Sequence, residues 1–358
     1  MLKQNILKKM QHDLLAWYVK NARPMPWRVK PASLKGHPNP YHVWLSEIML
    51  QQTTVAAVIP YFLKFIKRWP TIKALAKADL DHVLSAWAGL GYYARARNLH
   101  ACAQTILQEF NGEFPRDEKT LLGLKGIGPY TAAAIRSIAF NEQAVAIDGN
   151  VERVMSRLFA IQKPLTDIKY ELKEKANIIA ENNPHPSDFT QALMELGATI
   201  CTPKSPSCTI CPWIKQCKAH KQGIEAQLPI PSIKKSVPHK YGVIYWVTDH
   251  RGYFLARTRS QKLLHGMTEL PSTDWVEKKL FIEQDNFFPD LKWRELKGKK
   301  VEHQFTHFKL TLKIKIAVLP KKHELHKKNG YFWVNPDQID DYAFPTVMKK
   351  AIRLASAI

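Results

Sequence analysis

Hydrophobic residues recur at intervals of three and four along the first 200 residues, which is the spacing of one face of an α-helix. The N-terminal stretch shows this spacing from Ile6 to Trp17. Two further apolar stripes consist of Val55, Val58, Ile59, Phe62, Phe65 and Ile66, and of Leu99, Cys102, Ala103, Ile106 and Leu107. The pattern predicts an all-α region up to about residue 200.

The pattern changes after Cys201, where closely spaced prolines exclude long helices. These prolines are Pro203, Pro206, Pro212, Pro229, Pro231 and Pro238. Hydrophobic residues then alternate with polar or small ones from 309 to 318, as in a strand with one buried face. Similar strands are predicted at 241–247, 253–257 and 331–334. The second region is therefore expected to be α+β, with a helix at the C-terminus and a linker at 223–240.

Length and charge narrow the function. A chain of 358 residues is long enough for two domains, and its formal net charge of +22 favours a polyanionic partner such as nucleic acid. A basic protein without such a partner remains the alternative. Lysines interrupt every apolar run at the N-terminus, and no stretch is apolar for long enough to cross a bilayer. We therefore expect an intracellular, cytoplasmic protein without membrane association, whose thiols stay reduced.

Four of the five cysteines lie within 17 residues, at Cys201, Cys208, Cys211 and Cys217. Four thiolates on one short loop suit a tetrahedral metal ion or a cubane iron–sulfur cluster. Zinc ribbons usually pair two C-x2-C knuckles, and only one such pair is present here, so zinc is the weaker interpretation. The fifth cysteine, Cys102, lies on an apolar stripe and is predicted to be a core residue.

A glycine-containing turn, Lys125-Gly126-Ile127-Gly128, separates two helical segments within residues 121–140. Pro129 fits the first position of the second helix. Glycines allow the backbone to approach a ligand closely, and amides at a helix N-terminus bind phosphate. A lone G-x-G is usually only a turn, but this context predicts a helix–hairpin–helix motif that contacts DNA phosphates.

Two carboxylates occupy different sequence environments. Glu47 lies inside the apolar run 44–50, which predicts burial, a raised pKa and a general acid; an exposed face of an amphipathic helix is an equal alternative on spacing alone. Asp148 precedes a predicted helix at 151–161, where aspartate is a preferred N-cap. A capping carboxylate can still be catalytic. A protonated and an ionised carboxyl together suit cleavage of a glycosidic bond through an oxocarbenium-like state.

Several segments together resemble the adenine DNA glycosylases of the MutY type over nearly the whole chain. They are MPWR (25–28), WLSEIMLQQT (44–53), GLGYYARARNLH (89–100), LKGIGPYTAAAI (124–135), IDGNVERV (147–154), the four-cysteine loop and QFTHFKL (304–310). The resemblance implies a helical glycosylase domain at 1–222, with a 4Fe–4S loop at 201–217 and a Nudix-like domain at 241–358. It also implies a monomer that acts on double-stranded DNA containing adenine opposite 8-oxoguanine or guanine.

The resemblance assigns roles to individual residues. Glu47 would protonate adenine N7 and then assist water attack, while Asp148 would stabilise the developing sugar cation. Residues that hold this geometry would be Tyr130 and Asn150. The base pocket would be lined by Trp27, Arg28, Leu50 and Gln191, and the stack would be wedged by Gln52 and Tyr92. The large apolar residues among these could equally be ordinary core.

The second domain would read 8-oxoguanine through Thr306 and His307. Nothing in Gly266–Glu283 matches the acidic metal-binding box of Nudix hydrolases, so this domain is expected to bind and not to hydrolyse. The segment 30–39 looks like an insertion beside the pocket residues.

Two other functions compete with this one. A bifunctional lyase would need a lysine nucleophile after the hairpin, where this chain has Tyr130. A non-catalytic iron–sulfur DNA-binding or redox-sensing protein would not need both carboxylates in their motifs.

Overall fold

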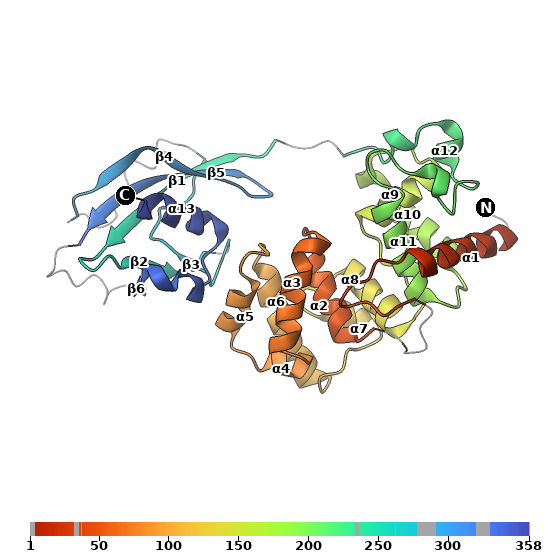
Figure 1. Ribbon diagram of the computed structural model, residues 1–358, viewed down its shortest axis with the longest axis horizontal. Coiled ribbons are helices and arrows are strands. Elements are labelled where there is room, and N and C mark those ends of the chain that lie inside the picture. The colour runs from red at the N-terminus through yellow and green to blue at the C-terminus, as the bar shows by residue number, and fades with distance from the viewer. Residues whose placement is uncertain are drawn as a thin grey trace. The chain divides into compact units, whose positions relative to one another are not determined.

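The predicted apolar stripes form helices in a helical unit, which comprises residues 1–77 and 98–233 of the computed structural model (Figure 1). A second unit, called the sheet unit, comprises residues 78–97 and 234–358. The structure describes residues 4–31, 36, 38–232, 236–261, 263–277, 291–319 and 330–357. The insertion predicted at 30–39 lies largely outside these residues. Among the residues that the structure describes, no helix is both long enough and apolar enough to cross a membrane.

The helical elements follow one another with short connections. They are α1 (Gln4–Asn21), α2 (Pro40–Leu50), α3 (Val55–Arg68), α4 (Ile72–Ala76), α5 (Leu80–Trp87), α6 (Ala94–Glu109), α7 (Glu118–Gly123), α8 (Pro129–Ala134), the π-helical turn η1 (Ile135–Ala139), α9 (Gly149–Phe159), α10 (Leu165–Ala180), α11 (Pro186–Thr199) and α12 (Lys218–Gln222). The helix α5 belongs to the sheet unit, and α6 begins in it. The all-α prediction for the first 200 residues is confirmed.

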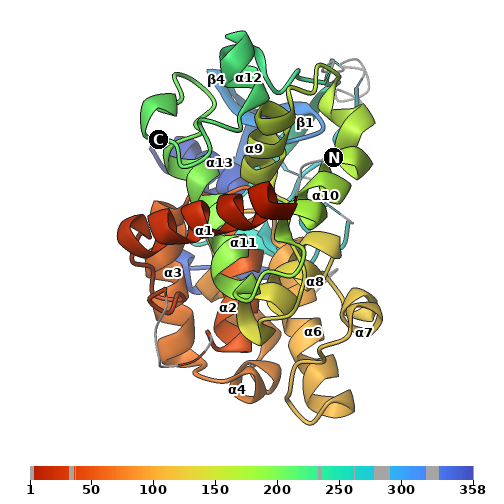
Figure 2. The same cartoon turned by 90° about the vertical axis from the view of Figure 1, so that its right-hand side faces the viewer.

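Helix α11 is central to one core of the helical unit. Ten of its residues are buried, and it packs against α9 and α1, which lies across it (Figure 2). Gly197 permits this packing, because a Cβ atom there would stand 2.6 Å from Cβ of Asn150 on α9. The predicted helix through residue 161 ends at Phe159, because Ala160 adopts a left-handed conformation with φ of 53°. Cys102 is fully buried, as predicted.

The sheet unit contains a mixed sheet. Its strands are β1 (His239–Thr248), β2 (Phe254–Thr258), β3 (Thr268–Glu269), β4 (Arg294–Gln304), β5 (Lys309–Val318) and β6 (Tyr331–Val334). Their order is β3-β2-β1-β5-β4, with β6 paired to β2, and β1 runs parallel to β5. Helix α13 (Thr346–Ser356) packs against β4 and β5 (Figure 1). The four predicted strands and the C-terminal helix are all confirmed.

The segment predicted as a linker, residues 223–240, begins as part of the helical unit. A short 3-10 helix, η3 (Glu225–Gln227), is followed by the buried Leu228, whose carbonyl accepts a 2.9 Å hydrogen bond from Arg157. Ile230 then forms a parallel β-bridge with Pro164. The chain leaves the helical unit only after these contacts, so the packed region extends beyond residue 222.

Candidate active site

A cavity of about 820 Å³ opens in the helical unit between α2, α8, α9 and α11. Nine of the predicted site residues line it: Trp27, Arg28, Glu47, Leu50, Gln52, Tyr130, Asp148, Asn150 and Gln191. They come from five separate stretches of sequence, so only the fold brings them together. Catalytic and ligand sites usually occupy such a concave pocket with a few convergent polar groups.

Glu47 is the buried carboxyl of this cavity, with 7% of its surface exposed. The Tyr130 hydroxyl donates a hydrogen bond of 2.6 Å to its Oε2 atom. Burial raises the pKa of Glu47 to about 7. The Tyr130 hydrogen bond opposes this rise, the charge of Asp148 adds to it, and Arg28 opposes it. A carboxyl with this pKa can donate a proton near neutral pH, as predicted.

Tyr130 reaches Glu47 because it is the second residue of α8, directly after the glycine-containing turn. Pro129 starts this helix, as the sequence predicted. Burial, followed by the charges of Glu47 and Asp148, raises the pKa of Tyr130 well above its usual value. The phenol therefore stays protonated and acts as a hydrogen-bond donor to Glu47.

Asp148 caps α9, as predicted. Its Oδ1 atom accepts hydrogen bonds from the backbone amides of Asn150 at 2.9 Å and Val151 at 2.8 Å, and its Oδ2 accepts one from the Asn150 side chain at 2.8 Å. The cap holds the carboxylate at the helix N-terminus, where the helix dipole favours negative charge. Asp148 therefore keeps a fixed position at the wall of the cavity.

Arg153 connects this site to the cysteine loop, and sequence reasoning did not find it. Its Nη2 donates to Oδ1 of Asn150 at 2.8 Å and to the carbonyl of Gly197 at 2.7 Å, and its Nε donates to the carbonyl of Cys201 at 2.7 Å. The available signal was an arginine pair, Arg153 and Arg157, inside a helix that is otherwise largely buried. Such arginines must find internal acceptors.

A third carboxylate, Glu195, lines the cavity and was also missed. Its side chain is 1% exposed, and it accepts a 3.1 Å hydrogen bond from Arg28 and two hydrogen bonds from Arg23. The signal was the same as for Glu47, a glutamate within an apolar run of a helix. The pairing differs, because Glu195 has two guanidinium partners.

The remaining predicted pocket residues form its walls. Trp27 is 8% exposed and packs edge-on against Phe62, with ring centroids 5.2 Å apart. Gln191 is buried on α11 and donates to the carbonyl of Ser187 at 3.2 Å, and Leu50 is half-buried at the end of α2. These side chains give the cavity both apolar surface and hydrogen-bonding groups.

The two predicted wedge residues share an unusual backbone. Gln52 is exposed with φ of 59°, and Tyr92 is 49% exposed with φ of 48°. Left-handed conformations of residues other than glycine cost on the order of 1–3 kcal/mol and concentrate at functional sites. Gln52 lines the cavity, whereas Tyr92 belongs to the sheet unit and is not among the lining residues.

The predicted phosphate-binding turn is formed as expected between α7 and α8. Lys125 is exposed, and Gly126 has φ of 81°, which favours glycine. A Cβ atom at Gly126 would also lie 3.0 Å from Cβ of Asn98. Gly128 is the N-cap of α8. The turn therefore leaves its backbone accessible, as a phosphate contact requires.

The four clustered cysteines surround one region of the helical unit. For a single zinc ion, sulfur atoms about 2.3 Å from the metal would lie about 3.8 Å apart. In the described part of the chain, no three of these thiols are grouped within 4.8 Å of one another. The thiols are nevertheless near enough to interact, since burial, followed by the charges of Glu225, Cys201 and Cys217, raises the pKa of Cys208. This spacing fits a polynuclear cluster better than one zinc ion.

Arg157 adds a positive charge beside these thiols. Its side chain is almost fully buried, and its Nη1 lies 3.4 Å from Sγ of Cys201 while donating to the carbonyl of Thr202 at 2.7 Å. A metal cluster with four thiolates is negatively charged, and a buried guanidinium offsets such a charge. The donor set and its surroundings therefore suit a 4Fe–4S cluster.

Thr306 and His307 are exposed at the turn between β4 and β5. The flanking Phe305 and Phe308 stack with centroids 4.7 Å apart, and Trp275 packs 5.8 Å from Phe305. These aromatic contacts fix the base of the turn, and at its tip the Thr306 hydroxyl lies 2.6 Å from the hydroxyl of Tyr92 in the same unit.

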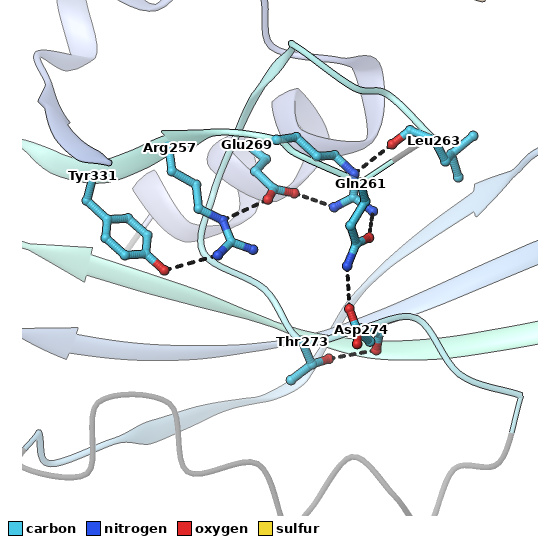
Figure 3. Close-up of polar contacts among 8 residues, drawn as sticks. Arg257, Gln261, Leu263, Glu269, Thr273, Asp274 and Tyr331 are labelled. Carbon is cyan, nitrogen blue, oxygen red and sulfur yellow. Dashed lines mark hydrogen bonds and ion pairs between the residues drawn. The ribbon is translucent and has the colours of Figure 1, made fainter. Parts of the chain in front are cut away.

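A polar network in the sheet unit joins Arg257, Glu269, Gln261 and Asp274 (Figure 3). The Arg259 guanidinium sits 4.4 Å from the Trp275 ring centroid and bonds to Glu269, which also accepts a 2.8 Å bond from Arg257. Both carboxylate oxygens of Glu269 are therefore engaged by arginines. This residue lies in the segment 266–283, in which no Nudix metal box was predicted; residues 278–283 lie outside the described part.

Two family models match the chain, one over the helical region and one over the region that contains the sheet. The model of the HhH-GPD superfamily of base excision DNA repair proteins matches residues 45–177, and the NUDIX domain model matches residues 243–354. The solved structure of a thermostable thymine-DNA glycosylase is 27% identical, with a TM-score of 0.53 over 61% of this chain and 98% of that one. An endonuclease III–DNA complex, at 24% identity and a TM-score of 0.51, has the same helical fold. The helical unit thus defines a base excision DNA glycosylase with a helix–hairpin–helix.

Full-length relatives narrow this class. The adenine DNA glycosylase of Buchnera aphidicola subsp. Acyrthosiphon pisum is 37% identical over 344 residues, covering 91% of this chain and 92% of that protein. The human adenine DNA glycosylase is 32% identical, and the match covers 96% of this chain and 73% of the human protein. The chain therefore belongs to the adenine DNA glycosylases.

Proposed function

We propose that this glycosylase flips adenine out of double-stranded DNA, where it lies opposite 8-oxoguanine or guanine, and hydrolyses its N-glycosidic bond without cutting the strand. The observation that carries the proposal is one cavity holding a buried carboxyl with a pKa raised to about 7 and a capped carboxylate, Asp148. One group can act as an acid and the other as an anion.

The reaction begins at the leaving group. Adenine departs poorly as an anion, so the base must be protonated, and Glu47 is the acid positioned to do this. The Tyr130 hydroxyl donates a hydrogen bond to the Glu47 carboxyl and would hold it in position for this transfer. The protonated base then leaves, and the ionised Glu47 accepts a proton from the attacking water.

Departure of the base leaves positive charge on the sugar. Asp148 lies at the cavity wall with its carboxylate fixed by the α9 amides and by Asn150. A preorganised anion stabilises a developing cation without having to reorganise. Replacing Asp148 by Asn should keep the helix cap but remove this charge.

The absence of a suitable amine favours hydrolysis over lyase chemistry. Among the described residues that line the cavity there is no lysine, and Tyr130 occupies the place where a lyase would carry one. A covalent imine with the sugar would need such an amine.

Recognition is divided between the pocket and the DNA backbone. The pocket walls, formed by Trp27, Arg28, Leu50 and Gln191, would hold the flipped base. Gln52 and Tyr92 would fill the space that the base leaves. Lys125, Gly126 and Gly128 would contact phosphates, and the net charge of +22 supports a phosphate-dominated interface.

The cluster loop at 201–217 would bind one 4Fe–4S cluster through Cys201, Cys208, Cys211 and Cys217. When bound, the cluster would cross-link this loop. The guanidinium of Arg157 would offset part of the negative charge of its thiolates. Purified protein should then carry about four irons per chain. Stoichiometric zinc without iron would contradict this assignment.

The domain at 241–358 would read the base opposite adenine through Thr306 and His307, whose exposed tip rests on the stacked phenylalanines. In the chain this domain would follow the glycosylase domain at 1–222 and the connecting segment at 223–240. The protein would be a monomer that acts on DNA inside the cell.

The decisive experiment incubates the protein with duplexes that carry adenine opposite 8-oxoguanine, guanine or thymine. Strand breaks that appear at the adenine only after alkali would support a monofunctional enzyme. Breaks without alkali, together with a complex trapped by borohydride, would show a lyase. A lack of excision from the first two duplexes would contradict the substrate assignment. Excision from both, lost in the Asp148→Asn variant, is the expected result.

A further inference from the structure

Two potential metal ligands beside the cysteine loop, His220 and Glu225, have no role in the function proposed above. Cys208, His220 and Glu225 offer one ligand atom each, all within 4.8 Å of one another, and theirs is the one such group of three among the described residues. They come from the 3-10 helix η2 (Cys208–Ile210), from α12 and from η3, at the edge of the helical unit (α12 in Figure 1). Only Cys208 belongs to the four thiols assigned to the cluster.

Glu225 is held beside Cys208 by a second contact. Its Oε1 atom lies 3.1 Å from Nδ1 of His220 and 4.0 Å from Sγ of Cys208. Its Oε2 atom is buried and has no hydrogen-bond partner in the part of the chain that the structure describes. A buried oxygen without a partner costs free energy, so its presence in a folded protein calls for an explanation.

The distance suits a shared metal ion. A first-row metal ion binds thiolate sulfur at about 2.3 Å and carboxylate oxygen at about 2.0–2.2 Å, so one ion can bridge atoms that lie about 4 Å apart. The surroundings of Cys201 differ, since this thiol contacts the guanidinium of Arg157. Of these two thiols, Cys208 therefore has a carboxylate as its neighbour and Cys201 has a guanidinium group.

We propose that Glu225 is a reserve ligand for the iron atom that Cys208 binds. When the thiolate is lost, a carboxylate lone pair forms the iron–oxygen bond in place of the iron–sulfur bond, and no electron is transferred. Oxygen ligands are accepted by iron, and a histidine that contacts a ligating carboxylate fixes its orientation. His220 would have this orienting role. The inference rests on the proposed cluster.

The test compares iron retention in single and double variants of the full chain. The Cys208→Ala variant should keep about four irons per chain, whereas Cys208→Ala/Glu225→Gln should lose at least one iron and show the paramagnetic signal of a three-iron cluster. Cys211→Ala is the matched control, because this thiol has no carboxylate in the group, and it should lose iron whether or not Glu225 is present. Iron is measured with a ferrous chelator after acid release, and the cluster type by electron paramagnetic resonance.

Folding is controlled separately. Circular dichroism should show helical content like that of the wild type, and if Cys208→Ala fails this control, the Cys208→Ser pair with and without Glu225→Gln replaces it. Equal iron loss in the variants with and without Glu225 would overturn the reserve role. Equal retention in Cys211→Ala and Cys208→Ala would also overturn it. A wild-type protein without iron would instead contradict the cluster itself, so the two failures are distinguishable.

Discussion

The two units each bury a glutamate, and the two residues have opposite surroundings. Glu47 in the helical unit is 7% exposed and accepts a hydrogen bond from the neutral hydroxyl of Tyr130. Glu269 in the sheet unit is 1% exposed and is bonded by two guanidinium groups, those of Arg257 and Arg259 (Figure 3). Burial is nearly the same in the two cases, but compensation of the charge is not.

The difference separates a reactive group from a structural one. Burial without a bonded cation destabilises the ionised form of a carboxyl. Its pKa therefore rises, and it holds a proton that it can transfer. A buried carboxylate with two arginine partners joins elements of the fold, here β2 with β3, and leaves both oxygens occupied. The same substitution, Glu to Gln, should therefore have opposite consequences in the two units.

The largest expected effect is on catalysis by Glu47→Gln. The amide keeps the shape of the carboxyl but cannot donate the proton, so single-turnover excision should fall by about 10²–10⁴. Binding to the mispaired duplex, measured by fluorescence anisotropy, should persist because the DNA contacts remain. Glu109→Gln, on the exposed surface of α6, is the control and should excise normally. Near-normal excision by Glu47→Gln would return Glu47 to an ordinary helix-face residue.

The next effect is on stability, in the sheet unit. Glu269→Gln leaves the buried guanidinium of Arg259 and the partly exposed one of Arg257 without their anion. Breaking a buried pair in this way costs about 3–5 kcal/mol. Urea unfolding followed by tryptophan fluorescence should show this loss. Glu302→Gln removes an exposed partner of Lys300 and should leave the curve unchanged. If both variants unfold alike, the Glu269 pair has no special structural role.

The third effect is a gain in stability when Glu47 is replaced. The pKa of Glu47 is raised from 4.5 to about 7 in the folded protein, so the folded state binds more protons than the unfolded state between these values. Stability from this group is therefore full below pH 4.5 and is lost as the pH rises to about 7, by about 3 kcal/mol in total.

Because Glu47→Gln does not titrate, its stability relative to the wild type should improve by this amount between pH 4.5 and pH 8. Thermal unfolding at the two pH values measures the change. A constant difference between the two proteins would show that Glu47 has an ordinary pKa.

The smallest effect concerns the pH dependence of the wild-type enzyme. If protonated Glu47 is the acid, the single-turnover rate should be level below pH 7 and fall about tenfold per unit above it. A binding titration over the same range separates this from weaker DNA affinity. An excision rate that rises from pH 6 to pH 8 would exclude Glu47 as the acid.

Local patterns predicted the elements of both folds. Apolar stripes at helical spacing predicted α1, α3 and α6, and strict alternation over 309–318 predicted β5. The helix end after Phe159 was missed, because Ala160 adopts a left-handed conformation that its residue type does not favour. The contacts of residues 225–230 were also missed, since they depend on acceptors and strands distant in sequence.

The site was predicted in part. Glu47 was identified as a candidate because it interrupts an apolar run, but spacing alone left an exposed helix face equally possible. Glu195 interrupts a similar run and was not identified, and only its arginine partners distinguish it from Glu47. Arg153 was missed because its role depends on acceptors that lie far from it in the sequence, the carbonyl groups of Cys201 and Gly197.

The sequence by itself determined which residue types were available: two carboxylates in unlike local settings, four clustered thiols and a glycine turn before a helix. Each of these depends on neighbours within a few residues, so it can be recognised along the chain. The tertiary structure decided which carboxyl holds a proton, because a pKa depends on burial and on charges brought close by folding. Tyr130 lies 83 positions from Glu47 in the sequence, yet its hydroxyl is 2.6 Å away in the fold.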